Sequence, residues 1–165
     1  MAVRPILHWP DKRLSTAAAP VGEVTDEVRQ IWQDMIDTME AMPGWGLAAP
    51  QIGVMRRLAV VDVSKERGKA VRLADPEIIQ ASMDLQKQTE ASPCLKSVSA
   101  KIARPTWVDV SFVDHVGLRV RQKFEGLWAV CVLHQIDHLN GKLYVSHLSR
   151  TKRDMLIKKS MKAQG

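Results

Sequence analysis

Hydrophobic residues recur at helical spacing near the start of the chain and form a continuous run soon afterwards. Residues 24–42 place apolar side chains three and four positions apart, which is typical of an amphipathic helix, and Thr25 is a suitable N-cap. Residues 57–63 form a short run rich in β-branched side chains, which predicts a buried strand. A further strand is expected around 71–80. The first half of the chain therefore combines one helix with buried strands.

The second half shows alternating strands and then helices. Residues 107–113 and 118–124 alternate apolar with polar side chains, which predicts an antiparallel hairpin with one face in water. An apolar helix is expected at 126–141 and a basic amphipathic helix at 147–163. The elements alternate too irregularly for repeated βαβ units. We therefore expect an α+β fold, with antiparallel or mixed strands packed around the helix 126–141 and a helix at the C-terminus.

Length and composition place the chain among ordinary globular proteins. The 165 residues are 45% hydrophobic and 25% charged, which fits one domain spanning 1–165. A core of this size needs no metal to hold it together, so a metal would serve chemistry. The two cysteines cannot form a disulfide framework. The start of the chain lacks a signal peptide and no apolar run is long enough to cross a membrane, so a cytoplasmic protein without a membrane partner is expected.

Two histidines carry the strongest chemical signal. His134 and His138 are four residues apart in the expected helix, so both imidazoles leave one face about 6 Å apart along the axis, a spacing that suits one metal ion. Such a pair is also often two ordinary core histidines, but burying both in an apolar helix without a partner is costly. Cys131 lies about 10.5 Å from His138 along the axis, too far to share the ion, and is expected to be a small buried hydrophobe.

A third ligand has to come from another segment. Cys94 lies in an irregular stretch, where a loop or edge strand could bring its thiolate to the helix. Two histidines, one cysteine and an open position form a catalytic arrangement, since a structural zinc site is closed by four protein ligands.

Three motifs resemble those of the peptide deformylase family. The segment 44–51, GWGLAAPQ, is similar to the family's GxGLAAxQ, and Cys94-Leu95 matches the centre of EGCLS. The segment 134–141, HQIDHLNG, matches HExDHLxG at all but one position. These motifs occur in the family's order and the resemblance covers most of the chain, so the coincidence is highly specific.

The resemblance implies an iron-type metalloamidase that removes the formyl group from the N-terminal formyl-methionine of nascent chains. The implied metal ligands are Cys94, His134 and His138. A divalent ion is expected, with Fe²⁺ the first choice and Zn²⁺, Ni²⁺ or Co²⁺ as alternatives that the same ligands accept. Such an ion lowers the pKa of bound water towards ~7 and polarises the formyl carbonyl.

The resemblance also assigns roles around the metal. Gln51 and the backbone N–H of Leu95 would donate hydrogen bonds to the developing oxyanion. The segment Gly44, Trp45 and Gly46 would lie along an extended substrate peptide, because its glycines allow close approach of the backbone. By itself, the same stretch also fits an ordinary glycine-rich turn before a strand.

The sequence departs from the family at two places. Gln135 occupies the position of the family's catalytic glutamate, and a neutral amide cannot take a proton from water. Asp137 is no obvious replacement, because the family carries it beside a working glutamate. Residues 92–96, SPCLK, stand where the family has EGCLS, so a carboxylate is lost and Pro93 removes an N–H.

Three functions follow as alternatives. The first is a deformylase-like amidase with reduced or altered activity, on formyl-methionyl peptides or another acylated amine. The second is a catalytically inactive paralogue that binds N-terminal peptides or the ribosome. The third is a metal-free structural remnant. The retained Cys94, His134, His138 and Gln51 favour the enzyme.

The positive charge lies mostly in the tail. The formal net charge is +6, and residues 150–165 hold six Lys or Arg against one Asp. A solvated helix end explains such a tail. The resemblance suggests another role, since deformylases of this type are thought to dock on the ribosome through a C-terminal helix, and a basic helix suits ribosomal RNA. No DNA partner is expected.

Overall fold

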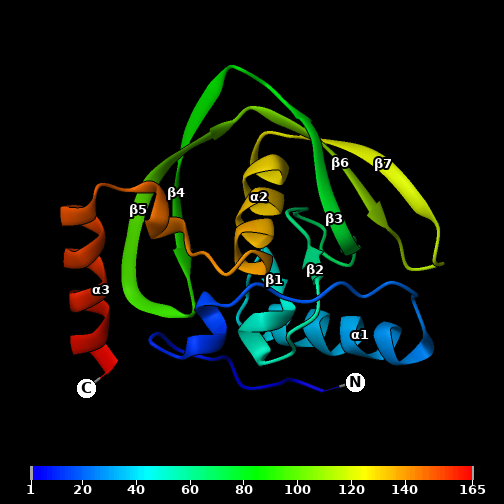
Figure 1. Ribbon diagram of the computed structural model, residues 1–165, viewed down its shortest axis with the longest axis horizontal. Helices are drawn as coiled ribbons and strands as arrows, with labels where there is room; N and C mark the ends of the chain where they lie inside the picture. Colours follow the sequence, from blue (N-terminus) through cyan, green and yellow to red (C-terminus); the bar gives the residue numbers. More distant parts are fainter. Residues whose placement is uncertain (1, 165) are drawn as a thin grey trace.

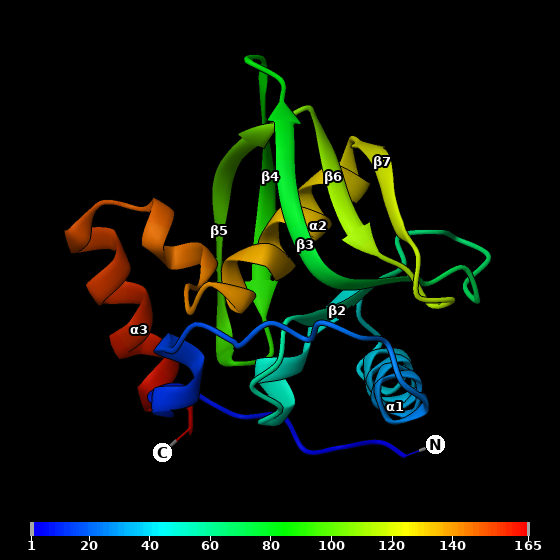
Figure 2. The same cartoon turned by 45° about the vertical axis from the view of Figure 1, so that its right-hand side comes forward.

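The computed structural model describes residues 2–164 and confirms the α+β fold (Figures 1 and 2). An antiparallel five-stranded sheet has the order β1 (Gly46–Ala48), β2 (Leu58–Val61), β3 (Val71–Ala81), β6 (Trp107–Val113), β7 (Arg119–Glu125). A separate two-stranded sheet consists of β4 (Leu85–Ser92) and β5 (Leu95–Pro105). The α-helices are α1 (Asp26–Ala41), α2 (Leu127–Leu139) and α3 (Arg150–Gln164). Short 3₁₀ turns cover Lys12–Ser15, Ala49–Ile52 and Tyr144–His147.

The continuous apolar run of β2 is buried on both faces because the sheet lies between two helices. Leu58 and Val60 belong to the core formed with α1, whereas Ala59 and Val61 belong to the core formed with α2. Successive side chains of a strand point to opposite faces, so one run of four residues contributes to both cores. The predicted buried strand is confirmed, and the layers α1, sheet and α2 follow from it.

Helix α1 forms as its periodicity predicts. The Thr25 hydroxyl accepts a hydrogen bond from the N–H of Val28, as expected of the N-cap. One face of the helix is buried, including Trp32 and Met35, which are fully inaccessible to solvent. This face packs against β1 and β2.

The predicted hairpin is present as β6 and β7. Val108, Val110 and Phe112 of β6 point into the core, and Phe124 of β7 joins them. Leu118 was expected to share this apolar face, but it lies before the strand and is 63% exposed. The hydrogen bond from the N–H of Asp114 to the carbonyl of Leu118 places Leu118 at the turn, where no core covers it.

The hairpin of β4 and β5, like the short strand β1, is not predicted by the sequence pattern. Most of β4 is polar, and the core side chains that the pair contributes, Leu95, Val98 and Ile102, lie on β5, so the apolar alternation is weak. Cys94, expected in an irregular stretch, lies in the turn that joins the two strands. The hairpin therefore carries Cys94 at a defined place beside the rest of the structure.

Helix α2 lies between the two sheets, in contact with β1, β2, β5 and β7 (Figure 1). It ends where the sequence predicts, at Asn140-Gly141, and a Cβ on Gly141 would lie 2.9 Å from the backbone of Ser15. The C-terminal helix expected at 147–163 is α3, which begins at Arg150 after a 3₁₀ turn. It packs against β5. None of the helices in residues 2–164 is both long and apolar enough to cross a membrane.

Candidate active site

A cavity of about 830 Å³ lies between β1, the β4–β5 hairpin and α2. Leu127, Val130 and Cys131 of α2 line one side, and the half-exposed Trp45 lies at its border. The sequence-predicted residues Gly44, Gly46, Gln51, Leu95, His134 and Gln135 also line it. The fold therefore gathers three separate motifs around one cavity.

His134 and His138 face each other as the four-residue spacing predicts. Their ring centroids are 5.0 Å apart, and both rings are buried. Within residues 2–164, neither ring nitrogen of His138 has a hydrogen-bond partner. Two effects hold the pKa of His138 well below its usual value of 6.5: burial is the larger, and the neighbouring His134 adds to it. The imidazole is thus kept neutral, which is the form that binds a metal.

Glu90 of β4 orients His134 and was missed by the sequence analysis. Its Oε1 lies 2.8 Å from Nδ1 of His134, which leaves Nε2 of that ring to face a ligand. The same carboxylate accepts two hydrogen bonds from Arg104, at 2.8 and 2.7 Å. Burial opposes the ionisation of Glu90, but the hydrogen bonds from Arg104 and His134 outweigh it and lower the pKa.

Glu90 lies two residues before Ser92. Ser92 is the position at which the EGCLS motif has its glutamate. The strand pairing is irregular between the two residues, but both are buried while Ala91 between them is exposed, so they share one face. This shared parity is the signal by which sequence reasoning could have found Glu90. A serine at position 92 therefore does not leave His134 without an acidic partner.

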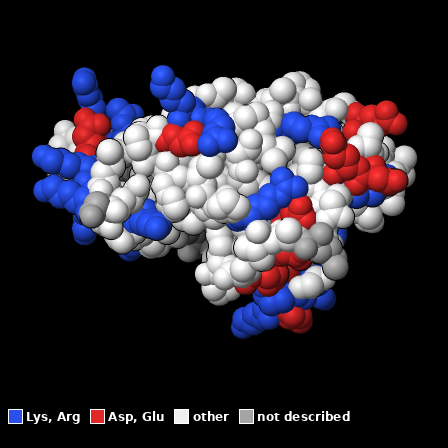
Figure 3. Space-filling model, turned by 90° about the horizontal axis from the view of Figure 1, so that it is seen from below, with Lys and Arg blue, Asp and Glu red and all other residues white. Residues whose placement is uncertain are grey.

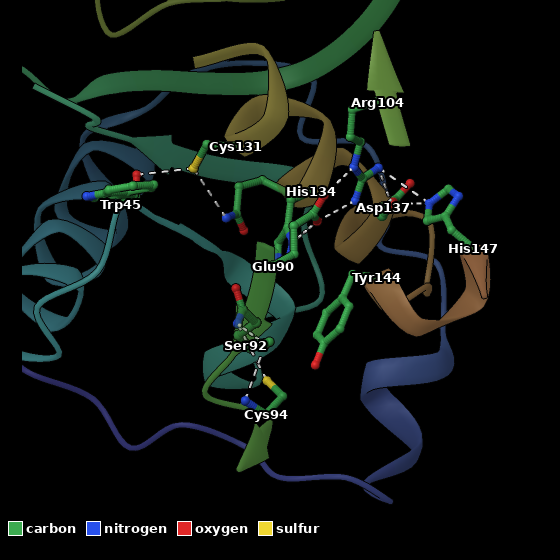
Figure 4. A network of polar contacts seen from close by, with 12 residues as sticks. Trp45, Glu90, Ser92, Cys94, Arg104, Cys131, His134, Asp137, Tyr144 and His147 are labelled. Carbon is green, nitrogen blue, oxygen red and sulfur yellow. Dashed lines mark hydrogen bonds and ion pairs between the residues drawn. The ribbon is translucent and has the colours of Figure 1, made fainter. Parts of the chain in front are cut away.

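The ionic network continues from Arg104 towards the surface (Figure 4). Nη1 of Arg104 donates to Oδ2 of Asp137 at 2.8 Å, and the same oxygen lies 2.8 Å from Nε2 of His147. Arg104 and His147 were also missed, because segments distant in sequence supply them. Asp137 therefore supports His134 indirectly, through Arg104 and Glu90.

Gln51 is held with its amide nitrogen towards the cysteine turn. The N–H of Ala48 donates to its Oε1 at 2.9 Å. Nε2 lies 3.5 Å from both Sγ of Cys94 and Oγ of Ser92. This orientation presents a hydrogen-bond donor, as the predicted role of Gln51 requires.

The donor chemistry of the three predicted ligands fits a transition metal only in part. Both imidazoles are buried and Glu90 orients that of His134, but burial raises the pKa of the Cys94 thiol, and its sulfur contacts Gln51 rather than a histidine. Across residues 2–164 there is no assembled group of three His, Cys, Asp or Glu side chains able to hold a metal ion. The three-ligand set of Cys94, His134 and His138 stays a prediction.

Gln135 lies on the cavity side of α2 with few polar contacts. Its Nε2 is 3.9 Å from Sγ of Cys131, and its buried Oε1 has no hydrogen-bond partner among the described residues. Cys131 donates to the carbonyl of Trp45 at 3.3 Å, and burial raises its pKa to about 12. A Cβ on Gly46 would lie 2.6 Å from Nε2 of Gln135 and 2.7 Å from Sγ of Cys131. Gly46 therefore allows β1 to pass close to α2.

Comparison with known proteins decides the family. The family profile described as polypeptide deformylase matches residues 3–154. The chain belongs to the peptide deformylase family. A peptide deformylase of Methylocella silvestris is 44% identical over 99% of this chain and 86% of its own length. One of Afipia carboxidovorans is 41% identical, covering 99% of this chain and 96% of its own.

Solved peptide deformylases share the fold. The Ehrlichia chaffeensis enzyme in complex with actinonin superposes with a TM-score of 0.93 at 35% identity, covering 99% of this chain and 98% of the other. The Legionella pneumophila protein has a TM-score of 0.92 at 37% identity, covering 99% and 96%. The predicted family membership is thus confirmed, and membership implies a divalent metal ion.

Proposed function

We propose that this chain is a metal-dependent peptide deformylase that acts on N-terminal formyl peptides of nascent chains, with turnover slowed by Gln135. The observation that carries the proposal is the oriented pair His134 and His138 beside the amide of Gln51, on a chain of this family. Glu90, itself held by Arg104, fixes the tautomer and orientation of His134, which a structural remnant would not need.

Cys94, His134 and His138 would hold the divalent ion, with Fe²⁺ favoured and Zn²⁺, Ni²⁺ or Co²⁺ accepted by the same donors. When bound, the ion supplies a Lewis acid for the formyl carbonyl and an activated water. The chain itself supplies hydrogen-bond donors for the developing oxyanion, from Nε2 of Gln51 and the backbone N–H of Leu95. The turn at Cys94 would have to bring its thiol towards the histidines for the ion to bind.

Strand β1 is the place for the substrate backbone. It is the terminal strand of its sheet and lines the cavity with the adjoining Gly44 and Trp45. An extended peptide can add to such an edge through main-chain hydrogen bonds. Its first side chain would then enter the apolar part of the cavity formed by Leu127, Val130 and Cys131.

Gln135 limits the chemistry because a primary amide has no basic site for a proton at neutral pH. A glutamate at this position would take the proton from water and pass it to the leaving nitrogen. General acid–base catalysis of this kind contributes about 10²- to 10⁴-fold in rate. Binding of metal and peptide does not require the proton carrier, so both should persist.

The test compares the wild-type protein with Gln135→Glu, both loaded with iron or cobalt without oxygen. With a formyl-methionyl peptide, we expect Gln135→Glu to raise kcat by about 10²- to 10⁴-fold. Gln135→Ala is the control that removes the amide without adding a base. Mass spectrometry excludes deamidation of Gln135 in the wild-type sample.

Calorimetry with the same peptide separates the alternatives. Affinity without turnover in either protein would identify a binding paralogue, and turnover only of another acylated amine would identify a different hydrolase. Absence of both metal and peptide binding under reducing conditions would leave only a structural remnant.

A second proposed interaction involves the basic helix α3. Figure 3 shows Lys and Arg side chains gathered at the end of the molecule that carries this helix. Lys158, Lys159 and Lys162 are exposed, whereas Leu156 and Ile157 pack against the core around β5. We propose that the exposed lysines contact ribosomal RNA.

Replacing these three lysines by glutamate tests the interaction better than deleting the helix, which would also uncover core residues. Ribosome co-sedimentation should be lost in the triple variant and in high salt, while thermal stability and metal content stay unchanged. Unaltered co-sedimentation would refute the RNA contact.

A further inference from the structure

The cavity border carries one cation that no part of the described chain neutralises. Lys96 follows Leu95 at the start of β5, lines the cavity and is exposed. It stands where the EGCLS motif has serine. We propose that Lys96 makes the site prefer N-acylated peptides that carry an acidic side chain close to the N-terminus. This inference rests on the proposed function and names its substrate class.

Charge pairing distinguishes Lys96 from the other ionisable side chains of the cavity. Glu90 also lines it, but its side chain is only 4% exposed and is paired with Arg104 and His134. Lys96 forms no ion pair with any Asp or Glu of residues 2–164. The net charge available to a ligand at this border is therefore the ammonium group of Lys96.

Apart from Lys96 and the paired Glu90, the side chains of β4 and β5 that line the cavity carry no charge. The polar ones include Gln88, Thr89, Ser97 and Ser99. An approaching carboxylate thus meets one attractive ammonium and no repelling acid that is free. Because a lysine is a point charge on a flexible stem, it selects for charge rather than for the shape of one side chain. Asp and Glu should both be favoured.

The position in the strand suggests which part of a peptide meets Lys96. Leu95, the preceding residue, is the proposed oxyanion donor, so Lys96 lies one residue from the place of the acyl group. A peptide added along β1 would lie in the cavity that Lys96 also lines. Acidic residues at the second and third peptide positions are therefore the ones to compare.

The test measures peptide affinity by calorimetry on the full-length, cobalt-loaded protein, so that it does not depend on turnover. The probes are formyl-Met-Glu-Ala and formyl-Met-Ala-Glu, each matched with its Gln and Lys counterparts. At low salt we expect the better Glu peptide to bind about two- to fivefold more tightly than its Gln counterpart, the range of an exposed ion pair. High salt should abolish the difference.

Two variants link the preference to Lys96. Lys96→Ser should remove the discrimination, and Lys96→Glu should reverse it in favour of the Lys peptide. Lys101→Ser is the matched control, because Lys101 is exposed on the same strand but does not line the cavity. It should leave the preference intact.

Different outcomes would contradict the role of Lys96 and the proposed function. Equal binding of Glu and Gln peptides by the wild-type protein, or a preference that survives Lys96→Ser, would overturn the role of Lys96 alone. Failure of every formyl peptide to bind would overturn this inference together with the proposed function.

Discussion

Helix α2 carries two unlike rows of polar side chains. Along one row, His134 and Asp137 join a buried network in which Glu90 and Arg104 satisfy every charge at 2.7 to 2.8 Å. Along the other, Nε2 of Gln135 contacts Sγ of Cys131 at 3.9 Å, and its Oε1 has no hydrogen-bond partner among the described residues. We call these the ionic row and the neutral row. His134 is thus held by charged partners, whereas Gln135 has no charged partner among residues 2–164.

The difference shows that a family site is built from parts that can change separately. A buried ion pair must keep both partners, since removing one leaves an uncompensated charge. A neutral amide such as Gln135 leaves no such charge behind. A change in the neutral row should therefore cost less stability than a change in the ionic row.

Removing the centre of the ionic row should have the largest effect on stability. Arg104→Met would leave Glu90 and Asp137 without their shared cation, and we expect a loss of about 3–5 kcal/mol in the free energy of unfolding. Urea denaturation at neutral pH measures it. Arg121→Met is the control, because Arg121 pairs with Asp109 at the surface and should cost at most about 1 kcal/mol. Equal losses of unfolding free energy in the two variants would show that the buried network stabilises the fold no more than a surface ion pair.

Crowding of the neutral row by the adjacent β1 should have the second-largest effect on stability. Gly46→Ala places a methyl group against Gln135 and Cys131, and overpacking of this kind costs about 1–3 kcal/mol. Gly44→Ala is the matched control, since its nearest neighbour, at 2.9 Å, is the terminal methyl of Met42, which can move aside. Thermal unfolding compares the two variants. Equal stability would mean that β1 shifts freely away from α2.

A change in the ionic row should weaken metal binding without a steric effect. Glu90→Gln removes the carboxylate that orients His134, and loss of such a partner costs about 10- to 100-fold in metal affinity. Competition with a chelator for Zn²⁺ or Co²⁺ measures the change. Glu125→Gln, on the exposed surface of β7, serves as the control and should not alter the affinity. An unchanged affinity in Glu90→Gln would separate Glu90 from the metal site.

The pH dependence of stability should also differ between the ionic row and the neutral row. The pKa of Glu90 is lowered below its ordinary value of 4.5 in the folded protein, so its ionised form stabilises the fold at neutral pH. This contribution is present above about pH 4.5 and is lost as the pH falls towards the lowered pKa. The difference in urea midpoint between wild type and Glu90→Gln should therefore shrink below about pH 4.5. Gly46→Ala should keep the wild-type pH dependence, because its steric effect involves no proton.

Local pattern predicted most of the elements correctly. Helical spacing identified α1, and alternation identified the hairpin of β6 and β7, because each element buries one face against the core. The hairpin of β4 and β5 was missed since its residues are mostly polar. Leu118 was misplaced because alternation continues beyond the end of the strand into the turn.

The sequence by itself determined the spacing of His134 and His138 and the three motifs by which the family was predicted, since all of these lie within short segments. Only the tertiary structure decided that Glu90 and Arg104 support His134, because three separate elements supply the network. It also decided that Lys96 lines the cavity without an ion-pair partner among residues 2–164. The pairing of charges depends on contacts between segments that are distant in sequence, and local periodicity does not predict such contacts.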